Sequence, residues 1–99
     1  MKLVFLDRKL AWICSDERRM VKRFGQAQSK KIMMRLNQLQ YAPNAESLKH
    51  MPGRFHQLAA NRNGQWACSL NGPWRMIFEV IDGSDQSVQI IEIINYHDS

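Results

Sequence analysis

The 99 residues of this chain suffice for one domain with a modest core and exclude a second domain. Hydrophobic residues make up 44% and charged residues 23%, which excludes an intrinsically disordered chain. The net charge of +5 points to a polyanionic partner, either a nucleic acid or an acidic protein, and a basic surface that only aids solubility is an equally good explanation. The apolar run 3–6 is too short for a signal peptide or a membrane span, so we expect a cytoplasmic protein with no membrane association.

The chain begins with two short predicted elements. Residues 2–6 are apolar enough for a strand, and a short helix is expected over 7–13 because Leu10 and Ile13 are spaced as one helical turn requires. Ser15 has a hydroxyl that can cap the next helix, and the two acidic residues after it suit the positive end of that helix dipole.

A longer amphipathic helix is predicted over 26–41. Its apolar stripe is formed by residues at i, i+4 and i+7, widened by two methionines: Ile32, Leu36, Leu39, Met33 and Met34. The cations of this segment are left on the side predicted to face solvent: Lys30, Lys31 and Arg35. Two basic, amphipathic helices in succession indicate a helical hairpin packed on one face of a sheet.

The second half of the chain reads as strands separated by turn residues. Strands are predicted over 54–58, 65–70, 74–81 and 87–96. Gly64 supplies one turn, Asn71-Gly72 is a strong hairpin signal, and 82–85 forms the last turn. The element order is therefore one strand, then helices, then an antiparallel meander, which is an α+β arrangement within a single domain over residues 1–99.

Chemically useful side chains gather on three of these strands: His56, Arg75, Asn95, Tyr96 and His97. A meander brings the three strands side by side, so these residues are candidates for a shared site. Each one also has a simpler explanation, since a single histidine is often a surface residue and Arg75 can pair with Glu79 or Glu92. Cys14 and Cys68 lie far apart and lack metal-ligand spacing, so we predict reduced, buried thiols and no metal or cofactor.

Short motifs in the second half resemble a known family. They are Phe55-His56-Gln57-Leu58, Asn63-Gly64-Gln65-Trp66, Trp74-Arg75-Met76-Ile77-Phe78, Asp82-Gly83 and the terminal Asn95-Tyr96-His97. The set is similar to the RelE/ParE superfamily of bacterial toxins, and within it to the HigB-type killer proteins. This resemblance implies two helices packed on a curved, mostly antiparallel sheet of four to five strands.

The resemblance also implies an activity, that of the toxin of a type II toxin-antitoxin system. Such a toxin is a ribosome-dependent endoribonuclease that cleaves messenger RNA by attack of the 2′-hydroxyl, without a metal. On this reading His56 and His97 transfer protons, Arg75 contacts the phosphate, and Tyr96 supplies a hydroxyl or a stacking surface.

Two positions depart from the HigB pattern. Asn95 stands where an Asp often precedes the Tyr-His pair, and it can still orient a histidine by hydrogen bonding. Ala59 stands where a Lys or Arg is common, which leaves Arg54 or Arg62 as the substitute cation. The residues predicted to contact RNA are Lys30, Lys31, Arg35, Arg54 and Arg62, joined by the Arg18 to Arg23 cluster for nonspecific phosphate contacts.

The partners implied are the ribosome, messenger RNA and a helix-turn-helix antitoxin of the HigA type, through which alone the toxin would reach operator DNA. Two alternatives stay open. One is a ParE-like toxin that inhibits DNA gyrase, against which the clustered histidines argue. The other is a catalytically weakened RNA-binding or antitoxin-paired module, for which Asn95 and Ala59 argue.

Overall fold

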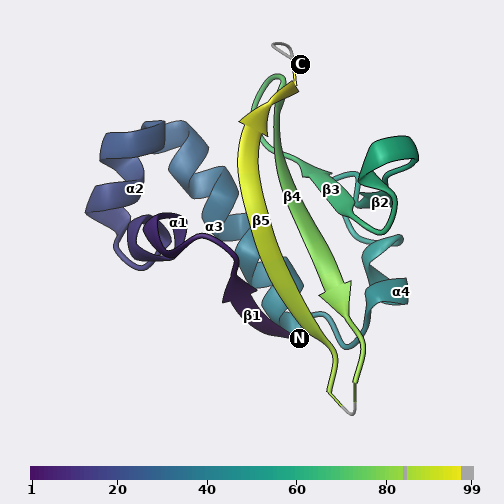
Figure 1. The fold of residues 1–99 in the computed structure, drawn as a ribbon. Coiled ribbons are helices and arrows are strands. Elements are labelled where there is room, and N and C mark those ends of the chain that lie inside the picture. The colour runs from purple at the N-terminus through teal and green to yellow at the C-terminus, as the bar shows by residue number, and fades with distance from the viewer. Residues whose placement is uncertain (84, 97–99) are drawn as a thin grey trace.

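A five-stranded mixed sheet organises the domain (Figure 1). The computed structural model describes residues 1–83 and 85–96. Its strands are β1 (Lys2–Phe5), β2 (His56–Gln57), β3 (Trp66–Ser69), β4 (Trp74–Ile81) and β5 (Ser87–Asn95), in the spatial order β1-β5-β4-β3-β2. β1 runs parallel to β5, and the other pairs are antiparallel. The predicted α+β fold with a mostly antiparallel sheet is confirmed.

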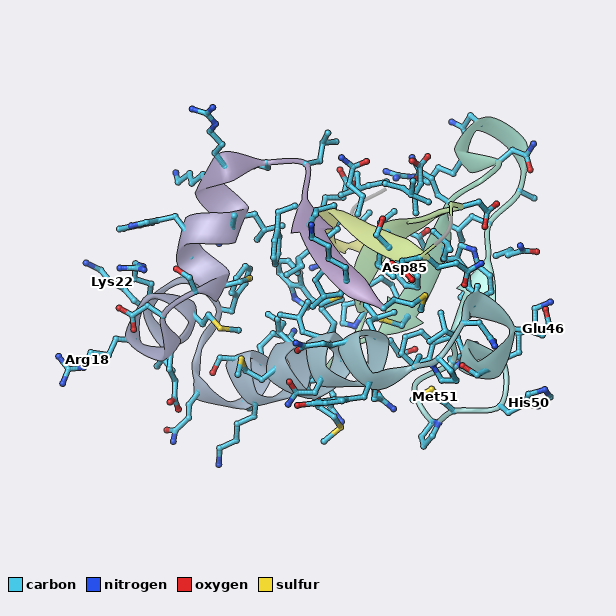
Figure 2. The ribbon with its side chains drawn as sticks, turned by 90° about the horizontal axis from the view of Figure 1, so that it is seen from below. Arg18, Lys22, Glu46, His50, Met51 and Asp85 are labelled. Atoms are coloured by element: carbon cyan, nitrogen blue, oxygen red, sulfur yellow. The ribbon has the colours of Figure 1, made fainter. Side chains whose placement is uncertain are left out.

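Helices cover one side of this sheet. They are α1 (Arg8–Cys14), α2 (Glu17–Phe24), α3 (Gln26–Tyr41) and the short α4 (Ala45–Leu48), while a 3₁₀ turn, η1 (Ala60–Arg62), lies between β2 and β3. Figure 2 shows α3 running along one side of the sheet, with α1 and α2 near its N-terminal end. None of the helices in the described part of the chain has both the length and the apolar composition needed to cross a bilayer.

The N-terminus of α2 lies one residue later than predicted. Asp16, with extended φ and ψ of −142° and 122°, is the N-cap, and its carboxylate accepts the Arg18 N–H at 2.9 Å. Ser15 instead ends α1 in a helical conformation, where its hydroxyl donates to the Trp12 carbonyl at 2.8 Å. The predicted cap at Ser15 is wrong because an N-cap residue needs extended backbone angles.

The predicted stripe of α3 packs on the sheet, but the two methionines beside it do not. Ile32, Leu36 and Leu39 are buried in the core with Phe78 of β4. Met33 and Met34 are 41% and 50% exposed, so the prediction that they widen the buried stripe is wrong. Each residue advances the helix by about 100°, which carries both methionine side chains past the sheet.

Arg35 is buried, whereas the two methionines are exposed. Its side chain was expected to face solvent, yet the residue is only 7% exposed. Its Nε donates to the Ser69 carbonyl of β3 at 2.7 Å, and its Nη1 donates to Gln38 Oε1 at 2.9 Å. The prediction of a solvent-facing Arg35 is wrong, because this cation lies between α3 and β3 and does not add to the basic surface.

Both cysteines are reduced and at least half-buried, and their burial has a pH consequence. Burial raises the pKa of Cys14 from 9.0 to about 11 and the pKa of Cys68 from 9.0 to about 12. Each folded-state pKa lies above the unfolded value, so the unfolded chain ionises first. The stabilising contribution is therefore complete below pH 9 and is lost as the pH rises towards 11 and 12.

We predict that the free energy of unfolding falls above pH 9 and that the variant Cys14→Ala/Cys68→Ala loses part of that dependence. Urea denaturation of both proteins between pH 8 and roughly 11 measures the difference. Parallel pH profiles for the two proteins would contradict the assignment of buried, neutral thiols.

Candidate functional site

The sheet has a face turned away from α3, and several candidate residues project from it. Met76 and Phe78 of β4 pack into the helix-covered core, so the alternate residues Arg75 and Ile77 point to the other side. We call this side the outer face. Cross-strand partners share a face, which places two rows there: Ser69, Arg75 and Ile94, and then His56, Ala67, Ile77 and Glu92.

His56 is exposed at the β2 edge of the outer face, and its ring is oriented by the backbone. Its Nδ1 lies 2.7 Å from the carbonyl oxygen of Arg54. A carbonyl can only accept, so Nδ1 carries the proton of this bond. In the neutral imidazole the Nε2 atom then holds the lone pair, which is the arrangement that a general base needs.

A pocket of about 440 Å³ lies near the C-terminal end of β5. It is lined by the connection between β2 and β3 on one side and by the end of β5 on the other: Leu58, Ala59, Asn61, Arg62, Ile94 and Tyr96. The Tyr96 N–H donates to the Pro73 carbonyl at 3.1 Å, which fixes the tyrosine backbone beside the β3–β4 turn. The fold thus joins segments far apart in sequence into one concave site with an aromatic ring and a cation.

Arg62 reaches across this site to β5. Its Nη2 lies 2.7 Å from Glu92 Oε1, and its Nη1 donates to Gln65 Oε1 at 2.9 Å. Sequence reasoning considered Glu92 only as a partner for Arg75 and so missed its contact with Arg62. The signal was available, because Glu92 is the one charged residue within the apolar run of β5.

Of the other predicted site residues, Arg75 lies on the outer face and Asn95 does not. Arg75 shares the outer face with Ile94, and its Nη1 donates to the carbonyls of Gly72 and Trp74 at 2.9 and 2.8 Å. Asn95 pairs with Trp74, which packs against the core, so its side chain belongs to the opposite face. His97 lies outside the described residues.

The predicted RNA-contacting cations fall into three groups. Arg62 lines the pocket, and exposed Arg54 precedes His56 by two residues. Lys30 and Lys31 lie on α3, on the far side of the sheet from the outer face, with Lys30 exposed and Lys31 half-buried. Arg35 is buried, so it is not available for a phosphate contact.

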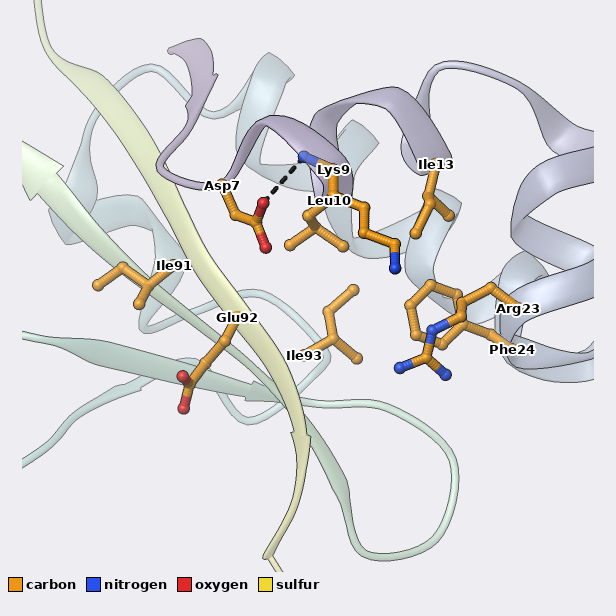
Figure 3. Close-up of a pocket in the computed structure, with 9 residues that line it drawn as sticks. All are labelled: Asp7, Lys9, Leu10, Ile13, Arg23, Phe24, Ile91, Glu92 and Ile93. Carbon is orange, nitrogen blue, oxygen red and sulfur yellow. Dashed lines mark hydrogen bonds between the residues drawn. The ribbon is translucent and has the colours of Figure 1, made fainter.

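A second, smaller pocket lies between the helices and β5 (Figure 3). It has a volume of about 170 Å³, and Lys9 and Arg23 approach it from α1 and α2. Ile93 points toward Leu10 and Phe24 while Glu92 points away from them, as the figure shows. This pocket therefore contains none of the predicted catalytic residues. In residues 1–83 and 85–96, no three His, Cys, Asp or Glu side chains are grouped to hold a metal ion.

We predict a modest, salt-sensitive coupling between Arg62 and Glu92. Both side chains are about one third exposed, so solvent screening limits the pair to about 1 kcal/mol or less despite the short distance. A double-mutant cycle with Arg62→Gln and Glu92→Gln, measured by urea denaturation, gives the coupling. A coupling near zero at low salt would show that the pair adds no stability in solution, and a coupling that added salt leaves unchanged would show that it is not a screened ion pair.

The chain was compared with protein-family models, curated proteins and solved structures, and only the solved structures match. No protein-family model matches the chain, and no curated protein matches it. Among solved structures, the YoeB/ParE toxin from Agrobacterium tumefaciens superposes with a TM-score of 0.66 at 21% identity, covering 94% of this chain and 95% of that one. The YoeB-YefM complex from Staphylococcus aureus matches with a TM-score of 0.63 at 16% identity, over 94% and 93% of the two chains.

The YoeB dimer from Staphylococcus aureus is similar as well, with a TM-score of 0.58 at 17% identity, over 93% of this chain and 92% of that chain. These matches cover nearly the whole domain, strands and helices alike. They confirm the predicted superfamily resemblance at the level of the fold, while the HigB-type subgroup stays a prediction. The chain has the RelE/ParE-like fold of YoeB/ParE-type toxins.

Proposed function

We propose that this protein is the toxin of a type II toxin-antitoxin system and that it acts as a metal-independent endoribonuclease on messenger RNA at the ribosome. Two things support the proposal. One is a fold shared with proteins named as toxins. The other, which carries the most weight, is the outer face, where His56 and Arg75 share a surface with a pocket lined by Arg62 and Tyr96.

The reaction is an attack of the ribose 2′-oxygen on the adjacent phosphorus. A bond forms between O2′ and phosphorus, and the bond from phosphorus to O5′ breaks, leaving a 2′,3′-cyclic phosphate and a 5′-hydroxyl. His56 accepts the 2′-hydroxyl proton through Nε2, because its Nδ1 is held by the Arg54 carbonyl. We assign proton donation to the leaving O5′ to His97, and each such group contributes about 10²- to 10⁴-fold.

The arginines are assigned to the charge that builds on the phosphate. With about 4.8 Å between strands and about 3.3 Å per residue, the Cα atoms of His56 and Arg75 lie roughly 12 Å apart on the outer face. That separation leaves room for a phosphodiester between an imidazole and a guanidinium. Arg62 leaves its ion pair with Glu92 and binds the next phosphate instead. The Tyr96 ring stacks on a base in the pocket.

The partners follow from the same proposal. The name of one similar structure pairs YoeB with YefM, and we assign to this chain an antitoxin of the helix-turn-helix, HigA-like type that carries it to operator DNA. In the cytoplasm the ribosome and its message are the targets. Cations on α2 and α3, such as exposed Lys30, then contact ribosomal RNA from the helix side.

We predict that His56→Gln reduces messenger RNA cleavage on induction by about 10²- to 10⁴-fold, because the base is removed while the exposed position tolerates the change. His50→Gln is the matched control, since His50 is an exposed histidine that follows α4. The measurement maps the 5′ ends of cellular messages. Intact messages with growth arrest and damaged chromosomes would reject the proposal in favour of a gyrase inhibitor.

We also predict that neutralising Lys30 and Lys31 together lowers the salt slope of ribosome binding by about two, because each phosphate contact contributes about one. Lys49→Gln is the control, since Lys49 pairs with Glu46 in the short α4 region. Binding titrations at several salt concentrations measure the slope. An unchanged slope would mean that the two lysines form only a solvated surface.

A further inference from the structure

Arg35 is an unusual buried residue, because its guanidinium faces backbone where a carboxylate would be expected. It is the one charged residue among the buried positions of the described chain. The ion pairs of that part of the chain involve other residues. A buried cation is costly unless hydrogen bonds replace its hydration, and here the Ser69 carbonyl and the Gln38 amide oxygen accept from it.

The guanidinium lies directly against Gly53. A Cβ built on Gly53 would stand 2.8 Å from Arg35 Cζ, so no larger residue fits without moving the arginine. The Gly53 carbonyl accepts a hydrogen bond from the Ser69 N–H at 2.8 Å. The Ser69 carbonyl in turn accepts one from Arg35 Nε at 2.7 Å. Gln38 bonds both Arg35 Nη1 and the Pro52 carbonyl. The segment 52–53 is therefore held at three points by α3 and β3.

This segment determines the backbone that orients His56. Arg54 has a φ of 55°, a left-handed conformation that is unfavourable for a residue with a Cβ. The left-handed turn directs the Arg54 carbonyl to His56 Nδ1 at 2.7 Å. β2 consists of only two residues, His56 and Gln57, so strand pairing supplies few bonds of its own and the preceding loop must hold the geometry.

We infer that Arg35 is a positioning residue for His56, which acts by packing on Gly53 and so holding the Arg54 carbonyl where it selects the Nδ1–H tautomer of the imidazole. The catalytic meaning of this arrangement rests on the proposed function. The arrangement itself is a property of the folded chain and is measurable without any RNA.

The tautomer distinguishes positioning from simple stabilisation. A neutral imidazole in water prefers the proton on Nε2, whereas the Arg54 carbonyl holds it on Nδ1. Loss of the carbonyl contact therefore moves the proton, and ¹⁵N chemical shifts of the ring report where it is. General loss of stability in a still-folded protein leaves that proton on Nδ1.

The experiment records ¹⁵N ring shifts of His56, at a pH where the imidazole is neutral, in the full chain and in Arg35→Met, Arg35→Lys and Gly53→Ala. His56→Gln assigns the signal. Gly25→Ala is the matched control, because both glycines have a positive φ, 86° at Gly25 and 121° at Gly53, but nothing lies within 4 Å of a Cβ at Gly25. If Arg35→Met fails to fold, Gly53→Ala and Arg35→Lys complete the test.

We expect Arg35→Met and Gly53→Ala to move His56 mainly to the Nε2–H tautomer, Arg35→Lys to move it partly, and Gly25→Ala to leave it unchanged. An unchanged Nδ1–H signal in folded Arg35→Met and Gly53→Ala would overturn the inference. If wild-type protein shows the Nδ1–H tautomer and the variants lose it while no message is ever cut, the proposed function fails and the positioning role stands.

Discussion

The pairing of β4 with β5, and the bulge within it, is the constraint on which the site depends. Val88 and Ile90 of β5 point into the core, so strict alternation would send Glu92 and Ile94 inward after them. The register shifts between Ile77 and Phe78, which leaves Ile91 as an extra residue on β5. The shift puts Ile93 on the core and turns Glu92 and Ile94 to the outer face.

The extra residue Ile91 therefore has two effects. It keeps the Glu92 carboxylate out of the core, and it turns the residues that line the pocket to the outer face. A carboxylate in the core would be unpaired and costly, whereas on the outer face Glu92 meets Arg62. Ile94 and Tyr96 then line one pocket with the β2–β3 connection. Without the extra residue, the cation and the tyrosine would be on opposite sides of the sheet.

Elements with long periodic patterns were predictable, and those set by tertiary contacts were not. The predicted ranges 74–81 and 26–41 coincide with β4 and α3, because alternation and the 3.6-residue period each extend over the whole element. The strand predicted over 54–58 shrinks to β2, since Arg54 takes a left-handed φ that no local pattern encodes. Burial of Arg35 likewise depends on the distant Gly53 and Ser69.

For the candidate site, the sequence suggests residue types but not the face of the sheet on which each residue lies. His56, Arg75 and Tyr96 belong with the outer face and its pocket, whereas Asn95 falls on the opposite side because one bulge resets the alternation. The fold alone does not assign an activity, since one fold serves many functions. The proposed link from this fold to RNA cleavage is the backbone-oriented ring of His56 together with Arg75 on the same outer face.

The chemistry of the cut ends tests the central claim most directly. Messages cleaved by the induced protein are recovered and the ends of both fragments are analysed. Attack by the 2′-hydroxyl predicts a 2′,3′-cyclic phosphate on the upstream fragment and a 5′-hydroxyl on the downstream fragment, which ligates only after a kinase adds phosphate. Downstream fragments that carry a 5′-phosphate, and ligate without the kinase, would contradict the account.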